Sequence, residues 1–268
     1  MWELVLVWWD KLLQKTSWRH KTNLTRHRPR GWHEAQLGPY FESQWSNLIA
    51  TYARKSESKR IRDIDLLLWQ FAINASKVPN KNKLNVSVGL MLFYRAHAAF
   101  RGAAALGLGG AVTEAMPVLR LCLETAGYAN MIAQRPELAK TWLMRGEDEK
   151  RRKAVKEAFR YSEIRKTMEA QDTALADVFQ KLYERTIDFG AHPNELGATT
   201  NTFIERQPDG GAIMGQVYLQ DDSLALDHWL RTAGQTGVCV LRIFEKLYPS
   251  LFQELGITER MPQVSHSL

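Results

Sequence analysis

Cysteine is scarce in this sequence, with only Cys122 and Cys239 among 268 residues. Two cysteines cannot form a disulfide scaffold or a cysteine-rich zinc site, and they suit a reducing compartment. No apolar run approaches the ~20 residues that span a bilayer. The apolar start carries Glu3 and Asp10 and lacks both a basic n-region and a small-residue cleavage site, so it does not fit a signal peptide. We therefore expect a cytoplasmic protein.

Metal and nucleotide motifs are also missing. The glycine-rich run at 106–110 is not preceded by a strand or followed by Gly-Lys-Ser/Thr, so it does not fit a phosphate-binding loop. His20, His27 and His33 lack the converging, rigid partners that a metal site needs. We expect no metal and no cofactor. His97 lies among alanines, where we expect a hydrogen-bonded core or interface group rather than a ligand.

Positive charge is concentrated at the N-terminus. Residues 1–62 hold 12 Lys/Arg and 5 Asp/Glu, so 12 − 5 = +7, which equals the net charge of the whole chain. The excess peaks in 17–30, which holds five bases and no acid: Arg19, Lys21, Arg26, Arg28 and Arg30. A basic arm of this kind suits the phosphates of nucleic acid, here RNA, and a membrane surface is the weaker alternative. A solvated linker is the third interpretation.

The same region is rich in tryptophan. It holds six of the nine tryptophans: Trp2, Trp8, Trp9, Trp18, Trp32 and Trp45. Interleaved arginine and tryptophan can stack on unpaired bases, and tryptophan beside basic residues also suits a membrane interface. For 2–14 we favour a short helix that packs through its tryptophans. We interpret 1–38 as a basic, Trp-rich N-terminal arm and 39–268 as a helical bundle domain.

Helical periodicity dominates the rest of the chain. The predicted helices start near Pro39 and then span about 60–76, 86–109, 113–134, 147–169, 172–190 and 223–247. Asp172 and Ser223 are the expected N-caps of the last two, and Pro117 is expected in the first turn of its helix. Near 199–219 two short alternating segments flank Pro-Asp-Gly-Gly, which predicts a hairpin. The expected fold class is mainly α, a helical bundle with one inserted β-hairpin.

A polar stripe marks the end of the predicted helix over 172–190. Arg185 and His192 are seven residues apart, about two turns, and Asp188 lies between them. Pro193 biases His192 away from helical geometry, which would place it at an exposed helix end. A cation, a carboxylate and an imidazole would then converge at that end.

Arginine followed, after four to six residues, by histidine is the signature of the HEPN superfamily, helical domains that include many metal-independent endoribonucleases. Arg185 and His192 match it with six intervening residues. Upstream, Arg120 and Glu124 stand four apart and meet on one helix face, either as a structural ion pair or as a motif. With the turn over 190–193, this pattern resembles uncharacterised bacterial proteins close to that superfamily. The resemblance covers roughly residues 86–247.

The resemblance implies a metal-independent endoribonuclease. His192 would act as general base or acid in the attack by the 2′-OH, and Arg185 would bind the scissile phosphate. Asp188, Arg120 and Glu124 would support them. A homodimer is implied too, and the small residues of 86–109 would let two backbones approach, within the fold or across the dimer. A toxin or defence system, with an antitoxin or other partner protein, is a further expectation.

The alternative is a non-catalytic helical module that binds RNA, a nucleotide or a protein partner. It would bind its ligand through the basic arm and through a groove beside Arg185 and His192, without cleaving it. Thr186 favours this alternative, because the family often has Asn, Asp or His directly after the arginine. Substitution of His192 separates the two hypotheses, since only an enzyme has an activity to lose.

Overall fold

The structure, a computed structural model, describes residues 31–265. The basic arm with Arg19, Lys21, Arg26, Arg28 and Arg30 lies outside the described residues, as does the helix expected over 2–14. The chain divides into two units at residue 40, and the structure describes residues 31–40 of the first and 41–265 of the second. Of the first unit, the described part is a turn at 31–36 followed by the start of α2.

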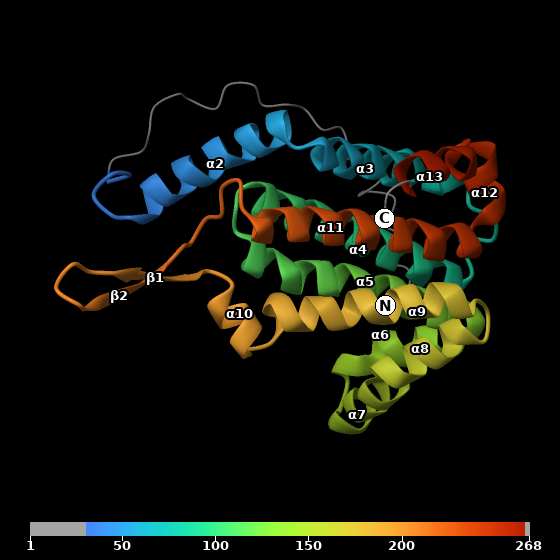
Figure 1. The fold of residues 1–268 in the computed structure, drawn as a ribbon. Coiled ribbons are helices and arrows are strands. Elements are labelled where there is room, and N and C mark those ends of the chain that lie inside the picture. Colours follow the sequence, from blue (N-terminus) through green and yellow to red (C-terminus); the bar gives the residue numbers. More distant parts are fainter. Residues whose placement is uncertain (1–30, 266–268) are drawn as a thin grey trace. The chain divides into compact units, whose positions relative to one another are not determined.

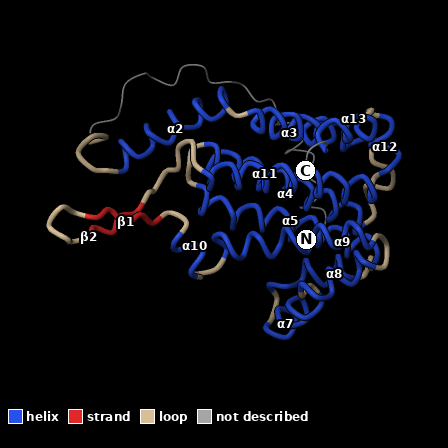
Figure 2. Tube along the Cα trace, viewed as in Figure 1, coloured by secondary structure: helices blue, strands red, loops and turns tan. Residues whose placement is uncertain are grey.

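Twelve α-helices and one β-hairpin make up residues 31–265 (Figures 1 and 2). The helices are α2 (Leu37–Arg54), α3 (Ser56–Asn74), α4 (Leu84–Leu108), α5 (Val112–Gln134), α6 (Leu138–Leu143), α7 (Glu149–Ala158), α8 (Tyr161–Glu169), α9 (Thr173–Thr186), α10 (Glu195–Thr199), α11 (Leu224–Leu247), α12 (Pro249–Glu254) and α13 (Ile257–Ser265). Strands β1 (Thr202–Arg206) and β2 (Ala212–Gln216) pair antiparallel, with Ile204 opposite Met214. The mainly α fold with one inserted hairpin is confirmed.

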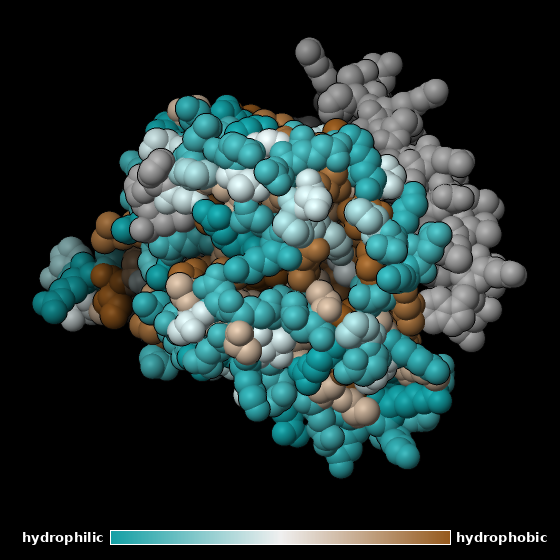
Figure 3. Space-filling view, turned by 90° about the vertical axis from the view of Figure 1, so that its right-hand side faces the viewer, coloured by the Kyte–Doolittle hydropathy of each residue, from teal (hydrophilic) through white to brown (hydrophobic). Residues whose placement is uncertain are grey.

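Helices α4, α5 and α11 form the centre of the second unit, and α3 and α9 pack against α11. Large side chains fill this centre, among them Phe93, Phe100, Trp229 and Phe244, all fully buried. Small residues of α4 serve contacts within the fold: a Cβ on Gly107 would overlap the ring of Trp229. Figure 3 shows one face of the molecule, where hydrophilic residues cover most of the surface and hydrophobic groups lie in the furrows between them.

Local signals located most helix starts correctly. The Asp172 carboxylate accepts a hydrogen bond from the backbone N–H of Leu175 at 2.9 Å, and the Ser223 hydroxyl accepts one from Leu226 at 3.1 Å. Both side chains are N-caps, as predicted. Four short helices, α6, α10, α12 and α13, have too few apolar repeats to be predicted from periodicity, and Pro249 begins α12 as well as following α11.

Three predictions about helix geometry were wrong, one of them the end at residue 190 of the helix that carries Arg185, which ends at Thr186. The single helix expected over 147–169 is two helices, because Phe159 leaves helical geometry and its buried ring packs 4.4 Å from the ring of Tyr128. Pro117 lies inside α5 as its sixth residue, not in the first turn. A proline has no N–H, so the carbonyl of Thr113 loses its donor within the helix.

His97 is a hydrogen-bonded core group, as predicted. It lies on α4, and its Nε2 is 2.8 Å from the Asp65 carboxylate of α3. Arg101 donates to both oxygens of the same carboxylate, at 2.6 and 2.9 Å, and its guanidinium lies 5.0 Å from the Trp69 ring. Burial alone would raise the pKa of Asp65, but the hydrogen bonds from His97 and Arg101 outweigh it and lower the pKa to about 2.

This carboxylate makes stability depend on pH. The pKa of Asp65 is lower in the folded chain than its ordinary value of 3.8, so its stabilisation is present above pH 3.8 and is lost as the pH falls toward 2. We expect a loss of about 2 kcal/mol over that interval, from about 1.4 kcal/mol per pKa unit. Urea denaturation at several pH values measures it, with Asp65→Asn as the variant that lacks this contribution. Equal acid sensitivity of the two proteins would contradict the assignment.

Candidate functional site

The segment that contains His192 follows a π turn at the C-terminal end of helix α9. The α-helical geometry ends at Thr186, earlier than the predicted residue 190, and a π turn covers Ile187–Ala191. Gly190 has φ +151°, and a Cβ at that position would overlap the Thr113 carbonyl oxygen. This is the carbonyl that Pro117 leaves without a helical donor. A glycine is therefore required where the turn meets α5.

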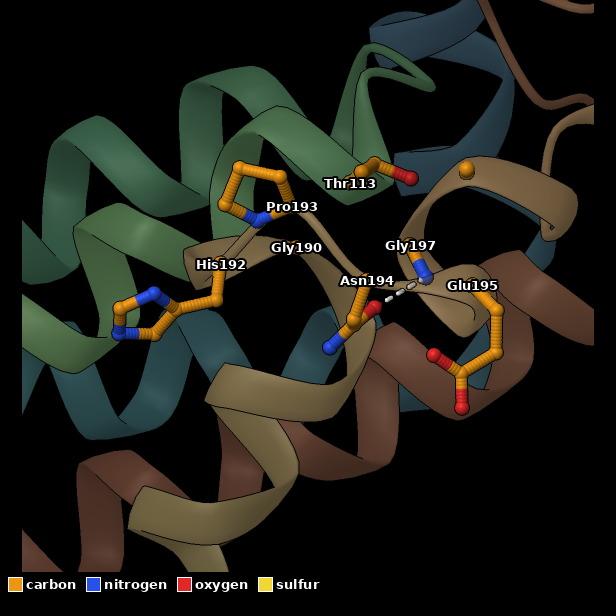
Figure 4. Close-up of a pocket in the computed structure, with 8 residues that line it drawn as sticks. Thr113, Gly190, His192, Pro193, Asn194, Glu195 and Gly197 are labelled. Carbon is orange, nitrogen blue, oxygen red and sulfur yellow. Dashed lines mark hydrogen bonds between the residues drawn. The ribbon is translucent and has the colours of Figure 1, made fainter.

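His192 is exposed at the edge of an open cavity of about 530 Å³ (Figure 4). Asn194 holds the chain here: its Oδ1 accepts from the backbone N–H of Gly197 at 2.8 Å, and its Nδ2 donates to the Ile187 carbonyl at 3.0 Å. Figure 4 shows the side chains of His192 and Glu195 pointing to opposite sides of this segment. The imidazole is thus reachable from solvent but has no carboxylate directed at it from Glu195.

Arg185 lines a different cavity, of about 390 Å³, between α9 and α11. Its Nη1 donates to Gln235 Oε1 at 2.5 Å and to Thr232 Oγ1 at 3.4 Å, both uncharged oxygens. Within residues 31–265 it forms no ion pair with a carboxylate. Burial lowers the pKa of Arg185, and the nearby positive charge of Arg231 lowers it further. The guanidinium is therefore a half-buried cation whose charge is uncompensated by the protein around it.

His228, on the first turns of α11, is the histidine whose charge couples to Arg185. Burial lowers its pKa first, followed by the positive charges of Arg185 and Arg231. Its ring packs 4.4 Å from the Phe189 ring, and its Nε2 is buried without a hydrogen-bond partner among the described residues. The sequence alone does not indicate His228 as a site residue, because its proximity to Arg185 arises from the packing of α9 on α11. No local spacing signals that contact.

The other candidate residues are divided between structural and exposed positions. Arg120 Nε binds Glu124 Oε1 at 2.8 Å, and Arg120 Nη2 donates to the Tyr183 hydroxyl at 2.7 Å. The Tyr183 hydroxyl in turn donates to Glu124 at 3.2 Å, so this cluster joins α5 to α9. Asp188 is exposed and forms no ion pair in the described part of the chain. Arg120 and Glu124 thus act as a structural ion pair.

The structure does not bring the two motif residues into one cavity. Arg185 and His192 line separate cavities, and no hydrogen bond joins them among residues 31–265. The described residues also contain no group of three or more His, Cys, Asp or Glu side chains that could hold a metal ion. None of the helices described here has the length and apolar character needed to cross a membrane.

Comparison with known protein families, with curated proteins and with solved structures finds no match to this chain.

Proposed function

We propose that this chain is a cytoplasmic RNA-binding protein in which Arg185 contacts a backbone phosphate. The observation that carries the proposal is the uncompensated charge of Arg185, which donates only to uncharged oxygens although it is half-buried. A guanidinium in such a place gains most from an anion that it can bind through two parallel hydrogen bonds, as phosphate allows. The basic arm of the sequence supplies further phosphate contacts.

Binding without catalysis is the form of this function that the geometry supports best. A metal-independent cleavage site needs its phosphate-binding cation and its acid–base group at one phosphodiester. Arg185 and His192 instead line separate cavities. The homodimer, the toxin or defence association and the antitoxin or other partner protein are predictions that accompany this proposal.

We expect Arg185→Gln to weaken binding of single-stranded RNA about 10-fold at moderate salt, since one charge-assisted contact is lost. The slope of log affinity against log salt should become shallower by about 0.7, the value for one phosphate contact on a single strand. Fluorescence anisotropy with a labelled RNA at several salt concentrations measures both quantities. Arg206→Gln is the matched control, because Arg206 is an exposed arginine on the hairpin. If both variants bind alike, Arg185 is not a phosphate contact.

A metal-independent endoribonuclease of the HEPN type is the second candidate, and two observations favour it. His192 is solvent-exposed at a cavity edge, and Arg185 has no carboxylate partner among the described residues. A general acid–base histidine must reach solvent and substrate, and a phosphate-binding arginine must not be neutralised by the protein.

A further inference from the structure

The cavity that holds Arg185 is lined by aliphatic side chains and carries positive charge at its edge. Val178 and Leu182 of α9 face Val238 and Cys239 of α11 across it. Its volume of about 390 Å³ lies in the range of small-molecule sites. Val178 is 45% exposed, so an apolar side chain is presented to the opening and not only to the core.

Three cations and no carboxylate are found among the residues that line this cavity. Lys181 and Arg185 stand four apart on α9 and therefore lie on the same helix face, and Arg242 comes from α11. Arg242 is paired with Glu245 at 3.0 Å, whereas Arg185 is bonded only to uncharged oxygens. The positive end of the cavity is therefore the end at Lys181 and Arg185.

The other end of the cavity lies between the first half of α9 and the second half of α11, and Ser265 of α13 also lines the cavity. Asp172, the N-cap of α9, binds Lys246 of α11 at 2.9 Å, while Arg185 at the other end of α9 bonds to Gln235. These two contacts show that the helices run antiparallel. Between them the cavity runs from Arg185 and Lys181 to Leu175 and Val178, and Arg242 lies at the Leu175 end, where Glu245 balances its charge. A ligand lying along it would have its charge at one end and its apolar part at the other.

We propose that this cavity binds a small anionic amphiphile, a carboxylate or phosphate head on an unbranched alkyl chain. The head binds Arg185 and Lys181, and the chain packs between Val178, Leu182 and Val238. Aliphatic lining residues, with no aromatic ring among them, favour an alkyl chain over a stacked base. The ligand is held without covalent chemistry, since Cys239 is buried and its thiol stays protonated near neutral pH.

This ligand would also compete with RNA, a consequence that rests on the proposed function because both anions use Arg185. Binding of the amphiphile itself does not depend on RNA. The two proposals can therefore fail separately. If the chain binds RNA through Arg185 but does not bind the amphiphile, only the amphiphile site is refuted. If it binds the amphiphile but Arg185 does not contribute to RNA binding, only the RNA contact is refuted.

Isothermal titration calorimetry of the full chain tests the cavity, with decanoate below its micellar concentration as the probe. Butyrate shares the head but lacks the chain, and decyl maltoside shares the chain but lacks the charge. We expect decanoate to bind at least about 10-fold more tightly than either, because only decanoate satisfies both ends. Decyl maltoside binding as tightly as decanoate, or no binding of decanoate, would overturn the proposal.

Variants then locate the bound decanoate. Arg185→Gln should weaken it about 10-fold and Lys181→Gln by less, because Lys181 is more exposed. Val178→Trp fills the cavity without changing its charge and should abolish binding, whereas Arg206→Gln on the hairpin should leave it unchanged. Near-UV circular dichroism confirms that each variant is folded. Unchanged affinity in both Arg185→Gln and Val178→Trp would place the ligand elsewhere and refute the site.

Discussion

Replacing Gly107 by alanine should lower the free energy of unfolding by roughly 1 kcal/mol. The added methyl group would overlap the ring of Trp229, which is fully buried at the contact of α4 with α11. A rigid indole in a close-packed core cannot move aside without displacing its neighbours, and overpacking of this kind costs about 1–3 kcal/mol. The usual gain of about 1 kcal/mol from alanine in a helix offsets only part of that cost.

Gly102 provides the matched control on the same helix. A Cβ there would meet only the Val118 Cγ1 atom, at 3.6 Å, which is an ordinary van der Waals contact. Gly102→Ala should therefore stabilise the protein by about 0.5–1 kcal/mol, chiefly by restricting the unfolded chain. Urea denaturation of the three proteins measures both effects. If Gly107→Ala is as stable as Gly102→Ala, the close approach of α4 to the Trp229 ring is incorrect.

The largest change in activity is expected for His192→Ala, if the chain cleaves RNA. General acid–base catalysis contributes about 10²–10⁴-fold, so cleavage should fall by that factor while RNA affinity stays within about 2-fold. The assay uses single-stranded RNA in the presence of a chelator and identifies product ends, with cyclic phosphate expected from 2′-OH attack. If the native protein does not cleave RNA, the endoribonuclease hypothesis is wrong and RNA binding remains as the proposed function.

His228→Ala distinguishes the two histidines near the end of α9. His228 couples electrostatically to Arg185, but its Nε2 is buried, whereas His192 is exposed. We expect His228→Ala to keep most of the cleavage activity, because a buried nitrogen cannot reach a phosphodiester. Loss of cleavage in His228→Ala with full activity in His192→Ala would exchange their roles. The π turn that contains Phe189, whose ring packs against His228, would then have to open to expose the imidazole of His228.

What the sequence could predict was local. A few neighbouring residues determine the helix caps at Asp172 and Ser223 and the hairpin around Pro-Asp-Gly-Gly. The contact of Arg185 with Gln235 joins residues 50 apart, and nothing in the sequence near either one indicates it. Helical spacing placed Arg185 and His192 on one face, but it assumed a regular helix through 190. The π turn after Thr186 breaks that assumption.

The hairpin also affects how the protein behaves at high concentration. Ile204 and Met214 lie on one of its faces and Phe203 and Ile213 on the other, and all four are 46–76% exposed. Its two edges differ: β1 carries Glu205 and Arg206, whereas β2 carries no charge from Ala212 to Gln216. Charge on an edge strand discourages pairing with another chain. In concentrated samples we therefore expect chains to associate through the uncharged edge, strand β2. Colloidal stability of this protein therefore depends on five residues that contribute nothing to its core.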